Sequence, residues 1–325
     1  EKGLDYPIGF VRWTVKRNFE AILNAISDNR INVDNLITTK VALEEYAKIY
    51  SDLDKKGSIA SIINYEPNDL NESRSVVLQS NDLSKTKGII GIIGSGNFTR
   101  AMIMPTLKKI GANVKYIASS RGLAGTNLAE KYGIGISTSD KEIIFNDSDV
   151  DAVLITTRHN HHANHVIKAL EAGKHVFVEK PLALTLEDLN DIEGIYNKSN
   201  KSVTVGFNRR FSPFARKAKD LICDDDHPIN VIATMNAGLI SMDHWVHDLE
   251  VGGGRIIGEA CHYIDLISFL TGSEVVSVVM NAQGVAPQID TDNASILLKY
   301  KNGSQGVINY FSNGNKGYSK ERIEI

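Results

Sequence analysis

Lys180 is the side chain whose position in the sequence most directly suggests chemistry. It follows the stretch "HVFV" (175–178), which has the composition of a core strand, and it stands between Glu179 and Pro181. A lysine near a core is costly unless its charge is used or paired, and proline fixes the backbone where the strand would continue. The stretch therefore has two interpretations: a solvated turn at a strand end, or a strand that carries an amine to a site.

A glycine-rich turn at 94–99 directly follows the apolar run "GIIGII" (88–93). Two glycines before a helix let backbone N–H groups approach a pyrophosphate, as in dinucleotide-binding folds. Alone, such a turn could also be a plain strand-to-helix connection. Because it opens a series of alternating strands and helices, we expect dinucleotide binding. The predicted cofactor contacts are Gly94, Gly96, Asn97, Phe98 and Thr99, the last of which replaces the third glycine of the usual fingerprint.

The end of the next strand bears on the choice of cofactor. A site that prefers NAD places Asp or Glu there to bind the ribose hydroxyls. This chain has Ser119, Ser120 and Arg121 instead. Arginine binds phosphate bidentately, whereas an acidic side chain would repel it. An ordinary solvated loop arginine is the alternative, but the sequence favours NADP over NAD.

Four histidines fall within the stretch "TTRHNHHANH" (156–165), which follows one apolar run and begins a helical one. His161 and His165 have the i, i+4 spacing of a metal-binding pair, but no glutamate follows His161 and the third ligand is unspecified. We therefore expect no metal and interpret the stretch as the cofactor-facing edge of a sheet. The residues predicted to lie near the nicotinamide are Thr157, Asn160 and His162.

Acidic and imidazole side chains also gather in the last third of the chain. Glu259, His262 and Asp265 have the spacing of one helix face, although Asp265 could simply be solvated. They follow a glycine-rich loop that lets a helix approach a ligand closely. Upstream, Asp243 and Trp245 lie in "DHWVHD", a composition expected where hydroxylated rings bind. An exposed loop anchored by Trp245 is the alternative interpretation of that stretch.

The composition excludes several classes of partner. Lys and Arg number 36 against 39 Asp and Glu among 325 residues, a net charge of −3. No basic face is implied, so we expect neither nucleic acid nor a membrane as partner. Cys223 and Cys261 fit no disulfide framework or zinc spacing, which suits a reducing cytoplasm. No apolar run has transmembrane length, and because Glu1 is not Met we expect the natural start to lie upstream.

The periodicity of apolar residues predicts three structured regions and a linker. Residues 1–65 are expected to form a small α/β segment, and the polar stretch 66–87 a linker. Between 88 and 207, continuous apolar strands alternate with helices, which favours a doubly wound parallel sheet covered on both faces. Residues 208–325 combine helices with alternating runs, which predicts an α+β domain with an open, largely antiparallel sheet. The expected parallel strands are 88–93, 114–119, 151–156, 175–179 and 202–207.

Four motifs occur in order along residues 87–325: "GSGNFT", "HVFVEKPLAL", "VGFNRRFSP" and "GGGRIIGEACHYIDL". Together they resemble the Gfo/Idh/MocA family, the group of glucose–fructose oxidoreductase and inositol dehydrogenase-like enzymes. The resemblance implies a Rossmann domain followed by a domain whose open sheet often serves oligomerisation, so we expect a homo-oligomer. It also implies hydride transfer between a nicotinamide and a hydroxyl of a sugar, nucleotide sugar or cyclitol.

The resemblance also implies roles for individual residues. Lys180 matches the lysine of the family's Glu-Lys-Pro motif, which lies beside nicotinamide and substrate. There it would take the hydroxyl proton when hydride leaves a carbinol carbon, and return it in the reverse direction. Glu179 is expected beside the cofactor, and His262 matches the family's active-site histidine. Asn208 and Arg209 are expected to contact the substrate, together with Asp243 and Trp245 of the preceding paragraphs.

Gly258 departs from the family pattern, which often has an aspartate four residues before that histidine. Glu259 lies one residue later and is the candidate substitute in catalysis. The departure keeps two alternatives to a dehydrogenase open. One is a non-catalytic NAD(P)-binding sensor or partner module, and the other is a redox-type glycosidase that retains its cofactor.

The front segment has a resemblance of its own. Residues 6–50 look like the C-terminal end of a medium-chain alcohol dehydrogenase, without a cofactor fingerprint or a cysteine for zinc. We therefore expect the chain to be part of a fused protein with two oxidoreductase domains. Such fusions suggest surface-polysaccharide or glycan metabolism.

Overall fold

The fold is seen in a computed structural model that divides the chain into two compact units, 1–72 and 73–325. Among the described residues, no helix is long and apolar enough to cross a bilayer. Cys223 lies outside the described residues, and Cys261 is a free thiol. The described residues are 5–51, 57–65, 73–79, 88–222, 227–284 and 292–325.

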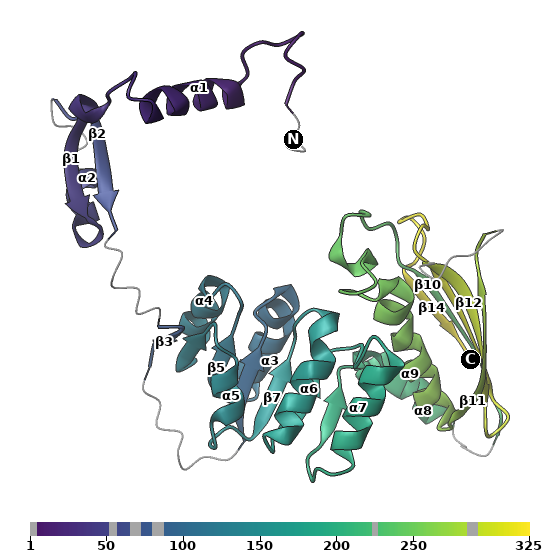
Figure 1. Ribbon diagram of the computed structural model, residues 1–325. Coiled ribbons are helices and arrows are strands. Elements are labelled where there is room, and N and C mark those ends of the chain that lie inside the picture. Colours follow the sequence, from purple (N-terminus) through teal and green to yellow (C-terminus); the bar gives the residue numbers. More distant parts are fainter. Residues whose placement is uncertain (1–4, 52–56, 66–72, 80–87, 223–226, 285–291) are drawn as a thin grey trace. The chain divides into compact units, whose positions relative to one another are not determined.

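The first unit contains an amphipathic helix and a parallel strand pair (Figure 1). Helix α1 begins after Thr14, whose Oγ1 accepts a hydrogen bond from the N–H of Arg17 at 3.3 Å. None of the unit's described side chains is buried, and the apolar side of α1 stays exposed at Phe19 and Leu23. The described part of this unit therefore has no core of its own. Its elements are α1 (Val15–Ser27), β1 (Ile37–Ala42), α2 (Tyr46–Ser51) and β2 (Ala60–Asn64), with short 3₁₀ turns before β1 and α2.

The second unit begins with a seven-stranded sheet, counted over the described residues, in the order β3-β6-β5-β4-β7-β8-β9. All neighbours are parallel except β3, which pairs antiparallel with β6. β3 lies within the predicted linker 66–87, so part of that stretch belongs to the sheet, while 66–72 and 80–87 lie outside the described residues. The strands are β3 (Ser75–Val77), β4 (Ile89–Ile93), β5 (Asn113–Ala118), β6 (Ile136–Thr138), β7 (Ala152–Ile155), β8 (His175–Val178) and β9 (Val203–Val205).

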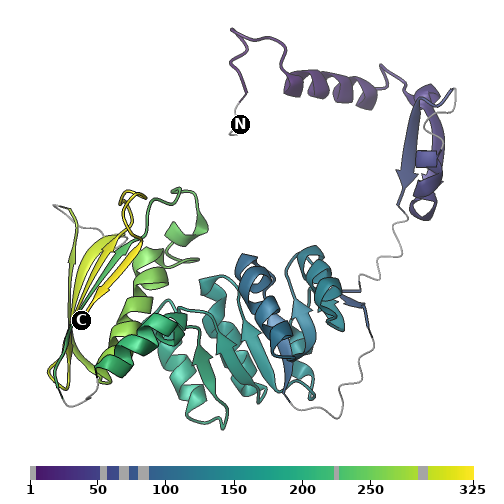
Figure 2. The same ribbon diagram turned by 180° about the vertical axis from the view of Figure 1, so that it is seen from behind.

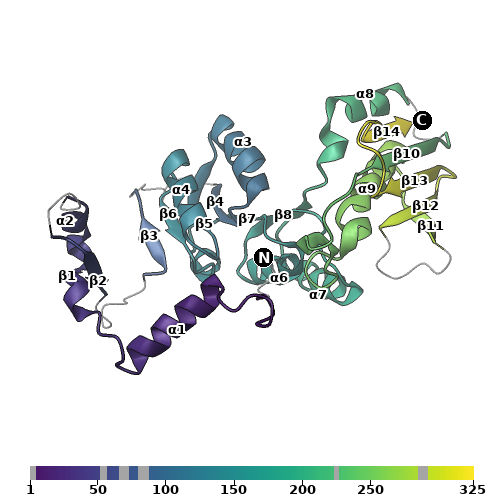
Figure 3. The ribbon, with the colours of Figure 1, turned by 90° about the horizontal axis from the view of Figure 1, so that it is seen from above.

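Helices cover both faces of this sheet, as the continuous apolar strands predict. Successive side chains of a strand point to opposite faces, so Ile92 and Ile93 of β4 enter different cores. Ile92 packs with α3 and α4, and Ile93 with α5, α6 and α7; Figure 3 shows α3 and α6 on opposite sides of the strands. The helices are α3 (Met104–Lys109), α4 (Leu123–Tyr132), α5 (Glu142–Asn146), α6 (His162–Glu171) and α7 (Leu186–Tyr196).

The C-terminal domain packs two helices on one face of a mostly antiparallel sheet (Figure 2). Over the described residues the strand order is β11-β12-β13-β10-β14, and only β10 and β13 run parallel. The other face carries a cross-strand apolar row of Val279, Leu297, Val307 and Ile232. The elements are α8 (Pro213–Leu221), β10 (Asn230–Asn236), a π-helical segment η7 (Ile256–Ala260), α9 (Cys261–Thr271), β11 (Val275–Ala282), β12 (Asn293–Tyr300), β13 (Gln305–Phe311) and β14 (Glu321–Glu324).

Candidate active site

A cleft of about 1190 Å³ lies at the carboxyl ends of β4, β5, β7 and β8 and reaches residues of the C-terminal domain. Open parallel sheets bind ligands at this edge, where the strand order reverses on either side of the first strand of the series. Most of the residues predicted from the sequence line it. They are Gly94, Gly96, Asn97, Phe98, Ser119, Ser120, Arg121, Thr157, His162, Glu179, Lys180, Asn208, Trp245 and His262.

The glycine-rich turn has the geometry of a cradle for a phosphate group. Gly94 has φ +117°, and a Cβ there would lie 2.6 Å from Oγ1 of Thr156 and 2.8 Å from its carbonyl oxygen, so only glycine fits. At Gly96 a Cβ would meet open space in the cleft. Thr99 is buried, and its Oγ1 lies 2.7 Å from Oγ1 of Thr156. Its hydroxyl bonds within the protein, which explains how threonine replaces the third glycine, and it does not line the described cleft.

The loops after β5 and β6 form the end of the cleft away from Lys180. Ser119 and Ser120 line this end, and Oγ of Ser119 donates to the carbonyl of Gly122 at 3.3 Å. Arg121 is exposed, and its guanidinium makes no hydrogen bond or ion pair with another described residue. Residues 139–142 also line it. They were not predicted, because the three-residue strand β6 that precedes them gives too short a periodic signal in its polar surroundings.

Lys180 lies at the cleft with its amine hydrogen-bonded to a backbone carbonyl. Its Nζ donates to the carbonyl oxygen of Gly258 at 2.6 Å. This hydrogen bond joins the domain of the parallel sheet to η7 of the C-terminal domain. The peptide bond between Lys180 and Pro181 is cis. Burial raises the pKa of the neighbouring Glu179 carboxyl, although the positive charge of Lys180 opposes this shift. Of the two interpretations of this stretch, the structure matches the strand that carries an amine to a cleft.

His262 lies in the first turn of α9 and lines the same cleft. Burial, and then the nearby charge of Lys180, lowers its pKa to about 3, so the imidazole is neutral near pH 7. Its Nδ1 is buried without a hydrogen-bond partner among the described residues, and the ring of Phe207 meets it edge-on at 6.2 Å between centroids. A neutral ring here adds no second positive charge beside the lysine.

His159 lines the cleft as well, although the sequence analysis did not select it. It belongs to the 3₁₀ turn η4 (His159–His161), and its Nδ1 lies 2.7 Å from the carbonyl oxygen of Gly252. The ring of Trp245 meets it edge-on at 4.9 Å. Burial is the main cause that lowers the pKa of His159 to about 4. Its position among four closely spaced histidines gave no signal that separated it from its neighbours.

The other histidines of this stretch contact neighbouring groups of the protein. Both ring nitrogens of His162 face backbone carbonyls, Nδ1 at 2.7 Å from Pro181 and Nε2 at 3.1 Å from Thr157. Because burial lowers the pKa of His162, the ring carries one N–H and donates to one of these two carbonyls. His161 and His165 stack ring on ring at 5.8 Å between centroids. Within the described ranges, no group of three or more His, Cys, Asp or Glu side chains is placed to hold a metal.

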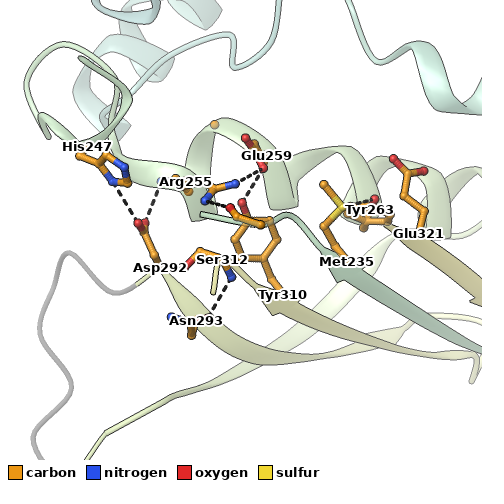
Figure 4. A network of polar contacts seen from close by, with 12 residues as sticks. Met235, His247, Arg255, Glu259, Tyr263, Asp292, Asn293, Tyr310, Ser312 and Glu321 are labelled. Carbon is orange, nitrogen blue, oxygen red and sulfur yellow. Dashed lines mark hydrogen bonds and ion pairs between the residues drawn. The ribbon is translucent and has the colours of Figure 1, made fainter. Parts of the chain in front are cut away.

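Glu259, the predicted substitute for the missing aspartate, lies in a separate polar network behind η7 (Figure 4). Its Oε2 accepts hydrogen bonds from the Tyr310 hydroxyl at 2.5 Å and from Nη2 of Arg255 at 3.3 Å. Arg255 also donates from Nη1 to the carbonyl of Gly238 at 2.7 Å. Among the described residues that line the cleft, Glu259 is absent, which corrects the expectation that it supplies a carboxylate there.

Three further predicted site residues have other partners and do not line the described cleft. The guanidinium of Arg209 lies 5.0 Å over the Tyr263 ring and pairs with Glu321. Asp243 is exposed and accepts a hydrogen bond from Ser241, which lowers its pKa. Asn160 has an exposed side chain and contributes only its backbone N–H, which donates to the carbonyl of Val251 at 3.1 Å.

The parallel sheet with its glycine-rich turn, followed by a domain that closes one side of the cleft, defines a class of two-domain dinucleotide-binding proteins. Residues 89–207 match the family described as an oxidoreductase family with an NAD-binding Rossmann fold, and residues 227–325 match the GFO/IDH/MocA C-terminal domain. The chain belongs to the Gfo/Idh/MocA family of oxidoreductases, which confirms that resemblance. These matches begin at residue 89, so the alcohol-dehydrogenase-like interpretation of the front segment stays a prediction.

Individual relatives agree with this assignment. The chain is 30% identical over 246 residues to the myo-inositol 2-dehydrogenase of Thermotoga maritima, covering 73% of this chain and 72% of that protein. A crystal structure of a probable dehydrogenase from Thermotoga maritima has a TM-score of 0.62 at 27% identity and covers 72% of both chains. Levoglucosan dehydrogenase in complex with NADH and levoglucosan has a TM-score of 0.62 at 25% identity and covers 73% of this chain and 70% of its own. The predicted fold class is confirmed.

Proposed function

We propose that the protein transfers hydride between a nicotinamide cofactor and a hydroxyl or carbonyl group of a sugar, nucleotide sugar or cyclitol. The observation that carries this proposal is the placement of Lys180, whose Nζ lies at the cleft and is held at 2.6 Å from the carbonyl oxygen of Gly258. The names of the relatives, which include a myo-inositol 2-dehydrogenase and a levoglucosan dehydrogenase, support the substrate class.

A bound nicotinamide supplies the acceptor for the hydride. The uncharged amine of Lys180 donates one N–H to Gly258, and its lone pair takes the proton of the substrate hydroxyl. The hydrogen of the carbinol carbon leaves as hydride, with both electrons of the C–H bond, to that acceptor. The carbonyl double bond forms as the O–H proton leaves. In the reverse direction the lysine ammonium returns that proton to the carbonyl oxygen.

His262 assists by hydrogen bonding to the substrate as a neutral imidazole, which is the state that its lowered pKa of about 3 favours. Asn208 and Trp245 line the same end of the cleft and supply a polar group and an apolar ring face, a combination suited to a hydroxylated ring. We therefore assign substrate contact to these three side chains. We do not assign it to Arg209 and Asp243, which do not line the described cleft.

The loop after β5 favours NADP over NAD, because Arg121 faces the cleft without an acidic partner among the described residues. Titration of the chain with NADPH and NADH, followed by nicotinamide fluorescence, tests this preference. We expect tighter binding of NADPH, and a loss of about tenfold or more in the affinity for NADPH alone in Arg121→Ala. Tighter binding of NADH would contradict the NADP assignment and leave the hydride-transfer proposal standing.

A substrate panel tests the reaction itself. Wild-type chain is incubated with NADP+ or NAD+ and with myo-inositol, levoglucosan, free hexoses and nucleotide sugars, while the absorbance of reduced nicotinamide is recorded. We expect at least one hydroxyl compound to be oxidised. Cofactor binding without oxidation across the panel would favour the sensor module, and cleavage of glycosides without net reduction would favour the redox-type glycosidase.

We also infer that the chain forms a homo-oligomer through the open face of the C-terminal sheet. The row of Val279, Leu297, Val307 and Ile232 runs across four strands of that face. Light scattering of the wild-type chain and of Leu297→Lys tests this inference. A monomeric wild type would contradict it, whereas dissociation in the variant would support it.

A further inference from the structure

The hydrogen bond from His159 to Gly252 determines which of its ring nitrogens carries the proton. The carbonyl oxygen of Gly252 only accepts, and it lies 2.7 Å from Nδ1, so Nδ1 is the donor. A neutral imidazole carries one N–H, which leaves Nε2 as an unprotonated acceptor. The edge-on contact with Trp245 at 4.9 Å holds the ring in this orientation.

The surroundings keep this acceptor neutral and open to the cleft. Burial, and in smaller measure the charge of Lys180, lowers the pKa of His159 to about 4. The residue is 9% exposed and lines the cleft. Its Nε2 makes no hydrogen bond with a described residue. The atom is also not enclosed by the protein, because enclosed side-chain atoms without a partner are found at other described residues only. Nε2 is therefore reachable from the cleft.

The ring of His159 also occupies the space beside Gly258. A Cβ at position 258 would lie 3.1 Å from Cε1 of His159 and 3.7 Å from its Nδ1. A side chain at 258 would therefore crowd the imidazole at 159, next to the carbonyl that holds Lys180.

We propose that His159 is a substrate-binding residue whose Nε2 accepts a hydrogen bond from a hydroxyl of the sugar or cyclitol beside Lys180. From the dinucleotide-binding domain, it supplies an acceptor where Gly258 has no side chain to supply one. Because the acceptor is neutral, it orients the hydroxyl compound without adding a negative charge next to Lys180. This assignment rests on the proposed function for the identity of its ligand.

Kinetics of two variants test the assignment with a compound that the panel shows to be oxidised, beginning with myo-inositol. His159→Phe keeps the ring area and removes both the acceptor Nε2 and the bond from Nδ1 to Gly252, so kcat/KM should fall by about tenfold to a hundredfold. His159→Gln keeps an acceptor and should lose less. The Kd of NADPH should stay unchanged in both variants. His175→Phe serves as the matched control, because His175 begins β8 at the end away from Lys180. An unchanged kcat/KM in His159→Phe would overturn the assignment.

A nitrogen NMR measurement tests the same assignment without any substrate. In the ¹⁵N-labelled chain near neutral pH, with the signal of His159 identified by its loss in His159→Gln, we expect a proton on Nδ1 and none on Nε2. A proton on Nε2, or on both nitrogens, would overturn the assignment. If the panel yields no oxidised compound, the proposed function fails, and this spectrum still decides whether His159 presents an acceptor to the cleft.

Discussion

Gly258 shows at the scale of one residue how a backbone group can do the work of a side chain. Its carbonyl oxygen accepts the hydrogen bond from Nζ of Lys180 at 2.6 Å. A carbonyl accepts that bond whether the lysine is charged or neutral, whereas a carboxylate would favour the charged form. The lysine is thus positioned by a neutral acceptor.

Restoring the aspartate of the family pattern should therefore impair this protein. In Gly258→Asp, the new Cβ would lie 3.1 Å from Cε1 of His159, so the ring must move, at a cost of about 1–3 kcal/mol for overpacking. We expect a lower unfolding temperature and a lower kcat/KM, with Gly258→Ala between the variant and wild type. Increased turnover in Gly258→Asp would mean that the chain lacks a carboxylate which it needs.

At the scale of elements, η7 is the segment that connects the cleft to the C-terminal sheet. It carries Gly258 on the cleft side and Glu259 on the other, where Tyr310 of β13 donates to the carboxylate at 2.5 Å. The Tyr310 side chain is fully buried, and burial together with Glu259 raises its pKa, so it stays a donor. Glu259 and Tyr310 therefore position η7 (Figure 4). Through η7 they also position the carbonyl of Gly258 that accepts from Lys180.

Removing the Tyr310 hydroxyl tests this positioning. Tyr310→Phe keeps the packed ring and leaves the Glu259 carboxylate with Arg255 only, at a cost of about 1–3 kcal/mol in the free energy of unfolding. We expect the pH profile of kcat to shift with little change in the Kd of NADPH, because the variant moves the acceptor of Lys180. If stability falls while the pH profile stays in place, Tyr310 has a purely structural role.

The elements also show which parts of the site can be predicted from sequence. Lys180 and the glycine turn were predictable because strand ends of a parallel sheet meet at one edge, and because a lysine at the end of a core strand is costly unless its charge is used or paired. The strands β3 and β6 were missed because each has only three residues and lies in a largely polar stretch, whereas the equally short β9 lies in the apolar run 202–207. Glu259 was misplaced because helix spacing assumes an α-helix, whereas η7 is π-helical and turns the side chains through different angles.

At the scale of the whole molecule, buried neutral histidines link stability to pH. Burial lowers the pKa of His159 to about 4 and of His165 and His262 to about 3. In the unfolded chain each would titrate near its ordinary value of about 6.5, so below that pH the unfolded state binds more protons. Stability is therefore fully present above about pH 6.5 and is lost as the pH falls toward 4, by up to about 1.4 kcal/mol per pH unit for each imidazole.

His165→Phe provides the check on this pH dependence. The Nδ1 of His165 is buried without a partner among the described residues, so a phenyl ring removes a titrating group at little cost in hydrogen bonding. The unfolding midpoint, measured in steps from about pH 7 down to about pH 5, should fall less steeply in the variant than in wild type. The exposed His175 supplies the control variant, His175→Gln, which should follow wild type. Equal slopes in His165→Phe and wild type would contradict the neutral, buried state of this histidine.

The central claim is that the amine of Lys180 moves the proton during hydride transfer. Its most direct test compares the turnover of wild type, Lys180→Ala and Lys198→Ala, an exposed lysine after α7, with the compound that the panel identifies. Each protein is first titrated with NADPH to show that the cofactor site is intact. We predict a fall in kcat of about 10²–10⁴-fold for Lys180→Ala alone, with unchanged NADPH binding. Wild-type turnover in Lys180→Ala would contradict the claim.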